Sequence, residues 1–170
     1  MKSIVIYSSL TGNTKQVAEA IASVLPEGTP CVVMSELPSD IASYDLVFAG
    51  FWADKGTANK EARDVLGTLH NPHIALFATA GVPPQMEHAK QSLVNAADCL
   101  PEGVVPVDTF ICQGKVDPKV IEMMYKMFPK GHSHGQSADR DARHKQAAVH
   151  PNEDDCKAAM EFAKHVLDSI

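Results

Sequence analysis

Short apolar runs alternate with helix-periodic segments along the first two-thirds of this chain, and this alternation limits the fold more than any other feature. The runs are rich in β-branched residues and too short for helices, so they predict strands. The predicted strands cover residues 2–7, 30–34, 44–52, 73–81 and 104–114, and the helices between them cover 13–25, 57–69 and 85–100. Because strand–helix–strand crossovers are right-handed, this pattern predicts an α/β fold with a doubly wound, five-stranded parallel sheet and helices on both faces. Ligands of such sheets bind at the carboxyl ends of the strands.

The last third of the chain is less regular. Helices are predicted over residues 117–128 and 138–149, and a strongly amphipathic helix over 155–170 is expected to cover the sheet. Residues 129–155 are polar and rich in histidine and turn formers. We therefore expect a single domain over residues 1–170, with a polar, histidine-bearing insertion at about 115–152 before the last helix.

Composition and charge exclude several classes of protein. A net charge of −6 and a pI of about 5.7 argue against a nucleic-acid-binding surface. The acidic balance is interpreted chiefly as an aid to solubility, with a basic protein partner as the alternative. No segment has the roughly 18 apolar residues of a membrane helix, and we expect no signal peptide because the sequence enters the first predicted strand directly. The four cysteines are scattered, which favours reduced thiols and a cytoplasmic location.

The segment "SLTGNT", from Ser9 to Thr14, joins the first strand to the first helix. Free amide groups and the helix dipole at this junction favour an anion, and the short polar side chains add neutral donors. Gly12 allows close backbone approach. The sequence therefore predicts a largely uncharged nest for a terminal phosphate, with Lys15 interpreted as solvated. An ordinary N-cap is the structural alternative, but it needs only one such residue.

The same segment resembles the flavodoxin family, whose pattern is [ST]-x-T-G-x-T after the first strand. Further along, "AGFWADKGTANKEA" (residues 49–62), "FICQGKVDP" (110–118), "GHSHG" (131–135) and "HPNEDD" (150–155) resemble the BilS-type subgroup, which is associated with bilirubin reductase in gut bacteria. The resemblance covers essentially the whole chain. It implies a flavodoxin-like sheet of order 2-1-3-4-5, bound FMN, and electron transfer to a redox partner protein, including a bilirubin reductase partner for the subgroup.

Flavodoxins bind FMN with three loops at strand ends, and the resemblance transfers this role to three segments here. The expected cofactor-binding residues are Ser9, Leu10, Thr11, Gly12, Asn13 and Thr14 in the first loop, Trp52, Ala53, Asp54, Lys55 and Gly56 in the second, and Thr79, Ala80 and Gly81 in the third. No catalytic residue and no metal ligand is expected.

Trp52, the only tryptophan, is interpreted as stacking on the flavin ring, with a structural tryptophan as the alternative. The peptide between Lys55 and Gly56 is a candidate for flipping when the flavin is reduced. The third loop, "TAGVPP" (residues 79–84), is small and rich in glycine and proline. It departs from the loop of typical flavodoxins, which carries an aromatic and acidic residues, and so leaves one flavin face less covered.

Two other groups of reactive side chains are interpreted as structural. Cys112 has no nearby base and is expected to be a small buried residue. His132 and His134 have the spacing of a chelating pair, but no third ligand has a recognisable spacing, so a solvated loop or a lid is favoured over a metal site.

Three functions from different classes fit to different extents. An FMN-binding electron carrier is favoured, with the protein supplying binding and tuning the potential. The alternative is an FMN-dependent NAD(P)H:quinone-type reductase, which the open third loop and the long tail would suit. A signalling domain of the response-regulator type is disfavoured because Ser8 and Ser9 stand where clustered aspartates are needed.

Overall fold

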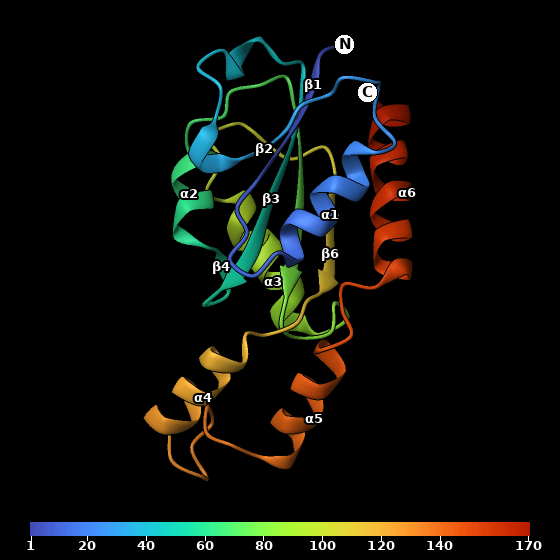
Figure 1. Ribbon diagram of the computed structural model, residues 1–170. Coiled ribbons are helices and arrows are strands. Elements are labelled where there is room, and N and C mark those ends of the chain that lie inside the picture. The colour runs from blue at the N-terminus through green and yellow to red at the C-terminus, as the bar shows by residue number, and fades with distance from the viewer.

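A computed structural model describes all residues, 1–170, and shows a three-layer α/β arrangement (Figure 1). The parallel sheet contains β1 (Ser3–Tyr7), β2 (Cys31–Val33), β3 (Leu46–Asp54), β5 (His73–Ala80) and β6 (Thr109–Gln113). Their order is β2-β1-β3-β5-β6, which is the predicted 2-1-3-4-5 order with one extra short strand counted. Continuous apolar runs form these strands because both faces of the sheet are covered: all five residues of β1 are buried.

Two pairs of helices cover the two faces of the sheet. α1 (Asn13–Ala22) packs beside α6 (Glu153–Ser169) on one face, and the other face carries α2 (Lys60–Leu66) and α3 (Glu87–Ala97). Each face has its own core, centred on Phe48 and Phe162 on the α1–α6 side and on Phe51 and Leu66 on the other. Two 3₁₀ turns, η1 (Met34–Glu36) and η2 (Ile41–Ser43), connect β2 to β3. None of the helices is long and apolar enough to cross a membrane.

The stretch expected to be a loop after the third strand is mostly a β-hairpin. β3 continues to Asp54 and pairs antiparallel with β4 (Thr57–Ala58). Lys55 and Gly56 form the two-residue turn, with φ angles of 50° and 80°. Positive φ at both turn residues matches the twist of the flanking strands, which explains why the chain folds back here. Trp52 therefore lies within a strand, opposite Thr79 of β5.

Two predicted boundaries need larger corrections. The fifth parallel strand was expected from residue 104 but begins at Thr109. Pro106 has no amide hydrogen to donate to a neighbouring strand. Two backbone hydrogen bonds join residues 104–108 to β5: the Val107 amide donates to the Ile74 carbonyl, and the Leu76 amide donates to the Asp108 carbonyl. The helix expected over 57–69 begins only at Lys60, because β4 uses the first residues.

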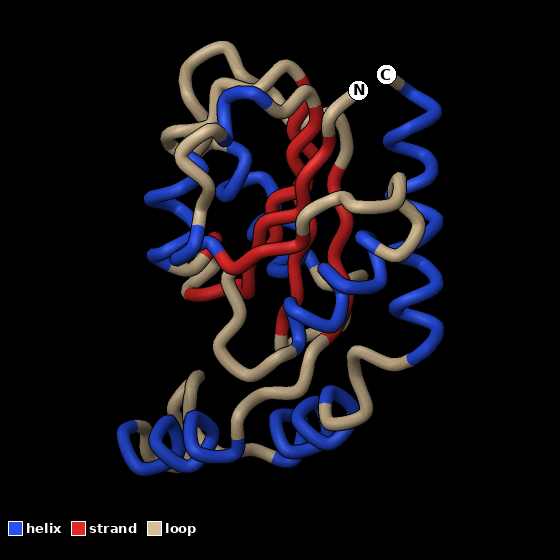
Figure 2. Tube along the Cα trace, turned by 45° about the horizontal axis from the view of Figure 1, so that its top comes forward, coloured by secondary structure: helices blue, strands red, loops and turns tan.

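The segment between β6 and α6 leaves the sheet and forms two further helices. α4 (Pro118–Met127) and α5 (Ala138–Ala147) lie beyond the end of the sheet where the parallel strands finish (Figures 1 and 2). The hydroxyl of Tyr125 on α4 donates to Asp141 of α5 at 2.9 Å, and this contact joins the two helices. The base of this segment is closed where the Lys115 amide donates to the His150 carbonyl at 2.8 Å.

Candidate functional site

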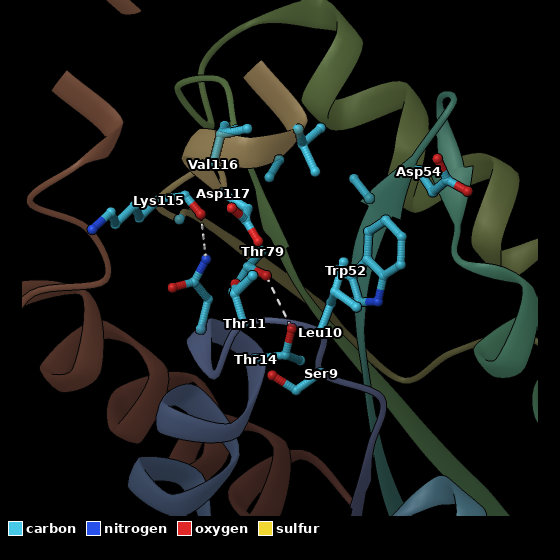
Figure 3. A pocket seen from close by; sticks show the side chains of 16 residues that line it. Ser9, Leu10, Thr11, Thr14, Trp52, Asp54, Thr79, Lys115, Val116 and Asp117 are labelled. Carbon is cyan, nitrogen blue, oxygen red and sulfur yellow. Dashed lines mark hydrogen bonds between the residues drawn. The ribbon is translucent and has the colours of Figure 1, made fainter. Parts of the chain in front are cut away.

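A cavity opens at the carboxyl ends of β1, β3, β5 and β6 and encloses about 690 Å³ of space that is continuous with solvent. Eleven of the fourteen predicted site residues line it: Ser9, Leu10, Thr11, Asn13, Thr14, Trp52, Ala53, Asp54, Thr79, Ala80 and Gly81. The structure thus brings together three segments that are far apart in the sequence. Figure 3 shows them facing one another, with the loop before α1 on one side and Trp52 on another.

The loop before α1 is held open by its own hydrogen bonds. The Ser9 hydroxyl oxygen accepts from the amides of Gly12 at 3.1 Å and Lys15 at 3.3 Å. Gly12 adopts a left-handed conformation with φ of 93°, which favours glycine. The amides of Thr11, Asn13 and Thr14 have no acceptor within the chain. These three amides lie at the positive end of the α1 dipole, where a helix N-terminus could hold an anion.

No cationic side chain completes this anion site. Lys15 pairs with Glu19 at 3.7 Å along α1. Lys115 is the only lysine or arginine that lines the cavity, and its amine points away from it (Figure 3). An anion held by this loop would therefore be attracted by backbone dipoles and hydroxyl groups rather than by a lysine or arginine side chain.

Two side-chain hydrogen bonds fix the loop to neighbouring strand ends. The hydroxyls of Thr14 and Thr79 lie 3.0 Å apart in a buried contact. The Asn13 side-chain amide donates to the Lys115 carbonyl at 2.8 Å. These contacts link the start of α1 to the end of β5 and to the segment after β6. They pass close to Gly114, where a Cβ would lie 2.8 Å from the Asn13 side-chain nitrogen.

A third connection, which the sequence did not reveal, runs to the start of α2. Ser8 donates its hydroxyl hydrogen to the Glu61 carboxylate, and the Asn59 side-chain amide donates to the same hydroxyl oxygen at 2.8 Å. Ser8 and Asn59 are both buried. These hydrogen bonds anchor the end of β1 to α2, in the helical layer on the other side of the sheet from α1.

Trp52 forms one wall of the cavity and is half-buried. Its register partner Thr79 lies at the base of the cavity. The third loop contributes only small groups, Ala80 and Gly81, to the lining. A Cβ on Gly81 would lie 2.5 Å from the Val116 side chain, so this glycine allows the segment after β6 to approach.

Three predicted site residues do not line the cavity. Gly12 shapes the first loop from between two lining residues. Lys55 and Gly56 form the tip of the β3–β4 hairpin. The Gly56 carbonyl accepts a hydrogen bond from the Asn95 side chain at 2.7 Å, which ties the hairpin to α3.

The segment after β6 supplies a fourth wall that was not among the predicted site residues. It consists of Gly114, Lys115, Val116, Asp117 and Val120. Asp117 also caps α4, because its carboxylate accepts from the Lys119 amide at 2.8 Å. Two sequence signals were available for this wall: it directly follows a strand whose carboxyl end reaches the cavity edge, and most of it lies in the 110–118 stretch that carries the subgroup resemblance.

The remaining reactive side chains lie outside the cavity. Cys112 is buried beneath it, and burial raises the pKa of its thiol strongly, so it is a protonated, packed residue as expected. His132 stacks on Phe128 with ring centroids 4.7 Å apart, and His134 lies beside both rings. No group of three His, Cys, Asp or Glu side chains is arranged to hold a metal ion.

Comparison with known proteins agrees with the fold and with the sequence resemblance. A flavodoxin-like domain-containing protein BilS of Clostridioides difficile (strain CD3) is 34% identical over 174 residues, covering 98% of this chain and 97% of that protein. A BilS protein of Clostridium symbiosum (strain WAL-14163) is 33% identical over 178 residues, covering 95% and 94%.

Solved structures share the fold at low sequence identity. Oxidised flavodoxin 2 from Bacillus cereus matches with a TM-score of 0.59 and 15% identity over 100% of both chains. A flavoprotein from Lactobacillus acidophilus NCFM, solved in complex with FMN, matches with a TM-score of 0.51 and 16% identity over 65% of this chain and 93% of that one. A model of the flavodoxin domain matches residues 4–164, and the chain therefore belongs to the flavodoxin family.

Proposed function

We propose that this chain binds FMN in the cavity at the carboxyl ends of the strands and carries electrons to a partner reductase. The observation that carries the proposal is that the amides of Thr11, Asn13 and Thr14 have no acceptor within the chain, and that these residues line a cavity with Trp52 on its wall. Such a site matches a ligand with a phosphate at one end and an aromatic ring at the other. Family membership and the FMN complex of a structural neighbour support the choice of cofactor.

Within this proposal, each segment has a separate task toward the cofactor. The amides of Thr11, Asn13 and Thr14, with the Thr11 hydroxyl, hold the phosphate, while Ser9 shapes the loop from within. Trp52 contacts one side of the ring system. Residues 79–81 and the wall after β6 border its polar edge. When bound, FMN supplies the redox chemistry, and the chain positions it and excludes water from part of its surface.

The partner role follows from the BilS-type resemblance. Two BilS proteins are similar to this chain over nearly their whole lengths. We therefore propose that the chain delivers electrons, or flavin itself, to a bilirubin-reducing enzyme. Direct reduction of a quinone by NAD(P)H is the second candidate, and the small side chains of Ala80 and Gly81, which leave room beside the ring, favour it.

Cofactor binding is tested by titrating the apoprotein with FMN while following Trp52 emission, which reports on the site because Trp52 is the only tryptophan. We expect stoichiometric quenching of both tryptophan and flavin emission. Riboflavin is the matched control because it lacks only the phosphate, and we expect it to bind at least about tenfold more weakly, a difference of about 1.4 kcal/mol. Equal binding of the two ligands would contradict the assignment of the phosphate site, and no quenching by FMN would contradict the cofactor.

The carrier and reductase functions are separated by steady-state assays of the FMN-loaded protein. A carrier oxidises NADH or NADPH very slowly in the presence of a quinone. It stimulates bilirubin reduction only when the reductase and a source of electrons are also present. Rapid NAD(P)H oxidation by the purified protein alone would favour the direct reductase.

A further inference from the structure

Helix α4 has two chemically different faces. Its inner face lies against the cavity and α5: Val120 lines the cavity, and Tyr125 bonds to Asp141 of α5. Its outer face carries two large apolar side chains that nothing covers, Met123 at 53% and Met127 at 65% exposure. No residue of α4 is fully buried. An apolar outer surface on a helix that already has a packed inner face requires an explanation.

Lysines flank the two methionines. Lys119, Met123, Lys126 and Met127 are spaced so that they lie on one side of the helix, and we call them the Met–Lys face. Lys126 pairs with Glu122 at 2.8 Å, whereas Lys119 has no carboxylate partner. Methionine side chains are flexible and polarizable, and they are common at surfaces that adapt to a protein partner.

The charge of this region is opposite to that of the rest of the molecule. From the start of α4 to the end of α5, residues 118–147, there are six Lys and Arg against three Asp and Glu, a net charge of +3. The remaining residues carry nine Lys and Arg against eighteen Asp and Glu, a net charge of −9. Separation of charge to this extent orients an approaching charged molecule before contact.

Figures 1 and 2 place this cationic pair of helices beyond the end of the sheet where the parallel strands finish. The residues that line the cavity lie at the same end of the strands. The net charge of −9 on the rest of the molecule repels an acidic protein surface, whereas the net charge of +3 on residues 118–147 attracts it. An acidic partner docked on the outer face of α4 would lie about one helix diameter, roughly 10 Å, from the inner face of the same helix, which borders the cavity.

We propose that the Met–Lys face is the docking surface for an electron-accepting protein that presents an acidic patch. This inference rests on the proposed function, because it assigns a direction to the electrons that FMN would carry. In the transfer, the oxidised centre of the acceptor would gain one electron and be reduced, and the FMN held in the cavity would lose that electron and be oxidised. The negative charge of the whole chain would predict the opposite preference, for a basic partner.

The test uses two c-type cytochromes of similar reduction potential, one acidic and one basic, as acceptors. The FMN-loaded protein is reduced anaerobically with dithionite and mixed with each cytochrome, whose haem Fe(III) accepts one electron. We expect the acidic cytochrome to be reduced faster than the basic one. Its rate should fall as salt is raised above about 0.1 M, because the Debye length is then shorter than about 10 Å and the attraction between the two surfaces is screened. A rate for the acidic cytochrome that rises with salt would overturn the proposal.

A pair of variants with equal change in net charge locates the surface. Lys119→Gln with Lys126→Gln should lower the rate with the acidic cytochrome at low salt about fivefold. The control, Lys60→Gln with Lys157→Gln, removes exposed lysines of α2 and α6 that pair with Asp64 and Glu153, and should change the rate less than twofold. An equal loss in both variants would overturn the proposal.

A second variant and a second binding assay complete the test. Met123→Gln with Met127→Gln should lower the rate at high salt as well, because it removes the apolar part of the contact. Sedimentation with vesicles of phosphatidylserine and phosphatidylcholine should show no binding. Binding that is lost in the lysine variant would assign the Met–Lys face to a lipid surface and overturn the proposal.

Flavin absorbance is recorded for every variant. Failure to retain FMN in the wild type contradicts the proposed function, whereas normal flavin content with no preference for the acidic cytochrome contradicts only the docking surface.

Discussion

The hydroxyls of Thr14 and Thr79 lie 3.0 Å apart and join the first turn of α1 to the end of β5. Both side chains are almost completely buried, at 1% and 3% exposure, and both residues line the cavity. The hydrogen bond therefore fixes the distance between the loop before α1 and the third loop. Such preorganisation lowers the entropy lost on binding.

Replacement of Thr14 by valine tests this link. Thr14→Val nearly keeps the side-chain shape but leaves the Thr79 hydroxyl buried without its partner, which should lower the free energy of unfolding by about 1–3 kcal/mol. Since the variant also removes a donor beside the anion site, FMN affinity should fall about tenfold, or about 1.4 kcal/mol. Urea unfolding of the apoprotein and fluorescence titration with FMN measure the two effects.

Thr68→Val is the matched control, because the Thr68 hydroxyl donates to the Val65 carbonyl on an exposed surface at the end of α2. We expect it to change stability by less than about 0.5 kcal/mol and leave FMN affinity unchanged. Wild-type FMN affinity in Thr14→Val would show that the link between the two loops does not contribute to binding.

The local sequence pattern was sufficient to predict the parallel sheet, because its strands are apolar on both faces. β1 and β5 are buried along almost their whole length, so neither could be mistaken for a surface segment. The β3–β4 hairpin was missed for a local reason. Its turn places Lys55, which is not a glycine, at positive φ, and β4 has only two residues, too few to form a period-2 pattern.

The cavity lining was predicted in two ways. The hydroxyl-rich loop was identified from its donors at a strand-to-helix junction, whereas residues 52–54 and 79–81 were identified from the resemblance to flavodoxins. The wall formed by Gly114, Val116 and Val120 was not identified, because these side chains have no binding signature of their own. Their position depends on the register of β6 beside β5, a long-range pairing.

A substitution at Gly12 tests whether the conformation of the loop before α1 contributes to FMN binding. An added Cβ at Gly12 would meet no atom within 4 Å, so only the backbone angle, φ of 93°, opposes a substitution. Gly12→Ala should lower the free energy of unfolding by about 1–2 kcal/mol and weaken FMN binding, because relaxation of the angle would turn the amides of the loop away from the phosphate.

Gly103→Ala is the control for Gly12→Ala, since Gly103 has φ of 81° and equally open surroundings but lies outside the cavity. It should show a similar loss of stability with unchanged FMN affinity. If both variants weaken FMN binding to the same extent, the loop conformation has no specific role.

Gly50 is required by packing rather than by its backbone angle. It lies in β3 opposite Phe77 of β5, and a Cβ added at Gly50 would overlap the Phe77 ring. Gly50→Ala should lower the free energy of unfolding by about 1–3 kcal/mol, as overpacking of a filled core does. Urea denaturation provides the measurement.

The double variant Gly50→Ala with Phe77→Leu distinguishes this overlap from a general intolerance of the strand. The smaller leucine side chain makes room, so the two changes together should cost at least about 0.5 kcal/mol less than the sum of the single changes. Additive costs would mean that the Phe77 ring is not what excludes a side chain at residue 50.

The thiol of Cys31 provides a pH-dependent prediction. Burial, with a smaller contribution from Glu19, raises its pKa to about 11. In the native state the thiolate fraction at about pH 8 is then only about one in a thousand, and alkylation by iodoacetamide should speed up about tenfold per pH unit until about pH 11. Peptide mass spectrometry of quenched samples measures the rate at this cysteine.

The unfolded chain in urea is the control for Cys31, because an unperturbed cysteine has a pKa of about 8.5. There the thiol should react faster at about pH 8 and gain little above about pH 9.5. Since the native state keeps this proton to a higher pH than the unfolded chain, the stability contributed by Cys31 is complete below about pH 8.5 and declines as the pH rises toward the native pKa. The urea concentration at the unfolding midpoint should therefore fall as the pH rises across this range, and it should fall less steeply in Cys31→Ala. If the midpoint falls equally steeply in both proteins and the native thiol is alkylated rapidly at about pH 8, the thiol is not shielded as the structure indicates.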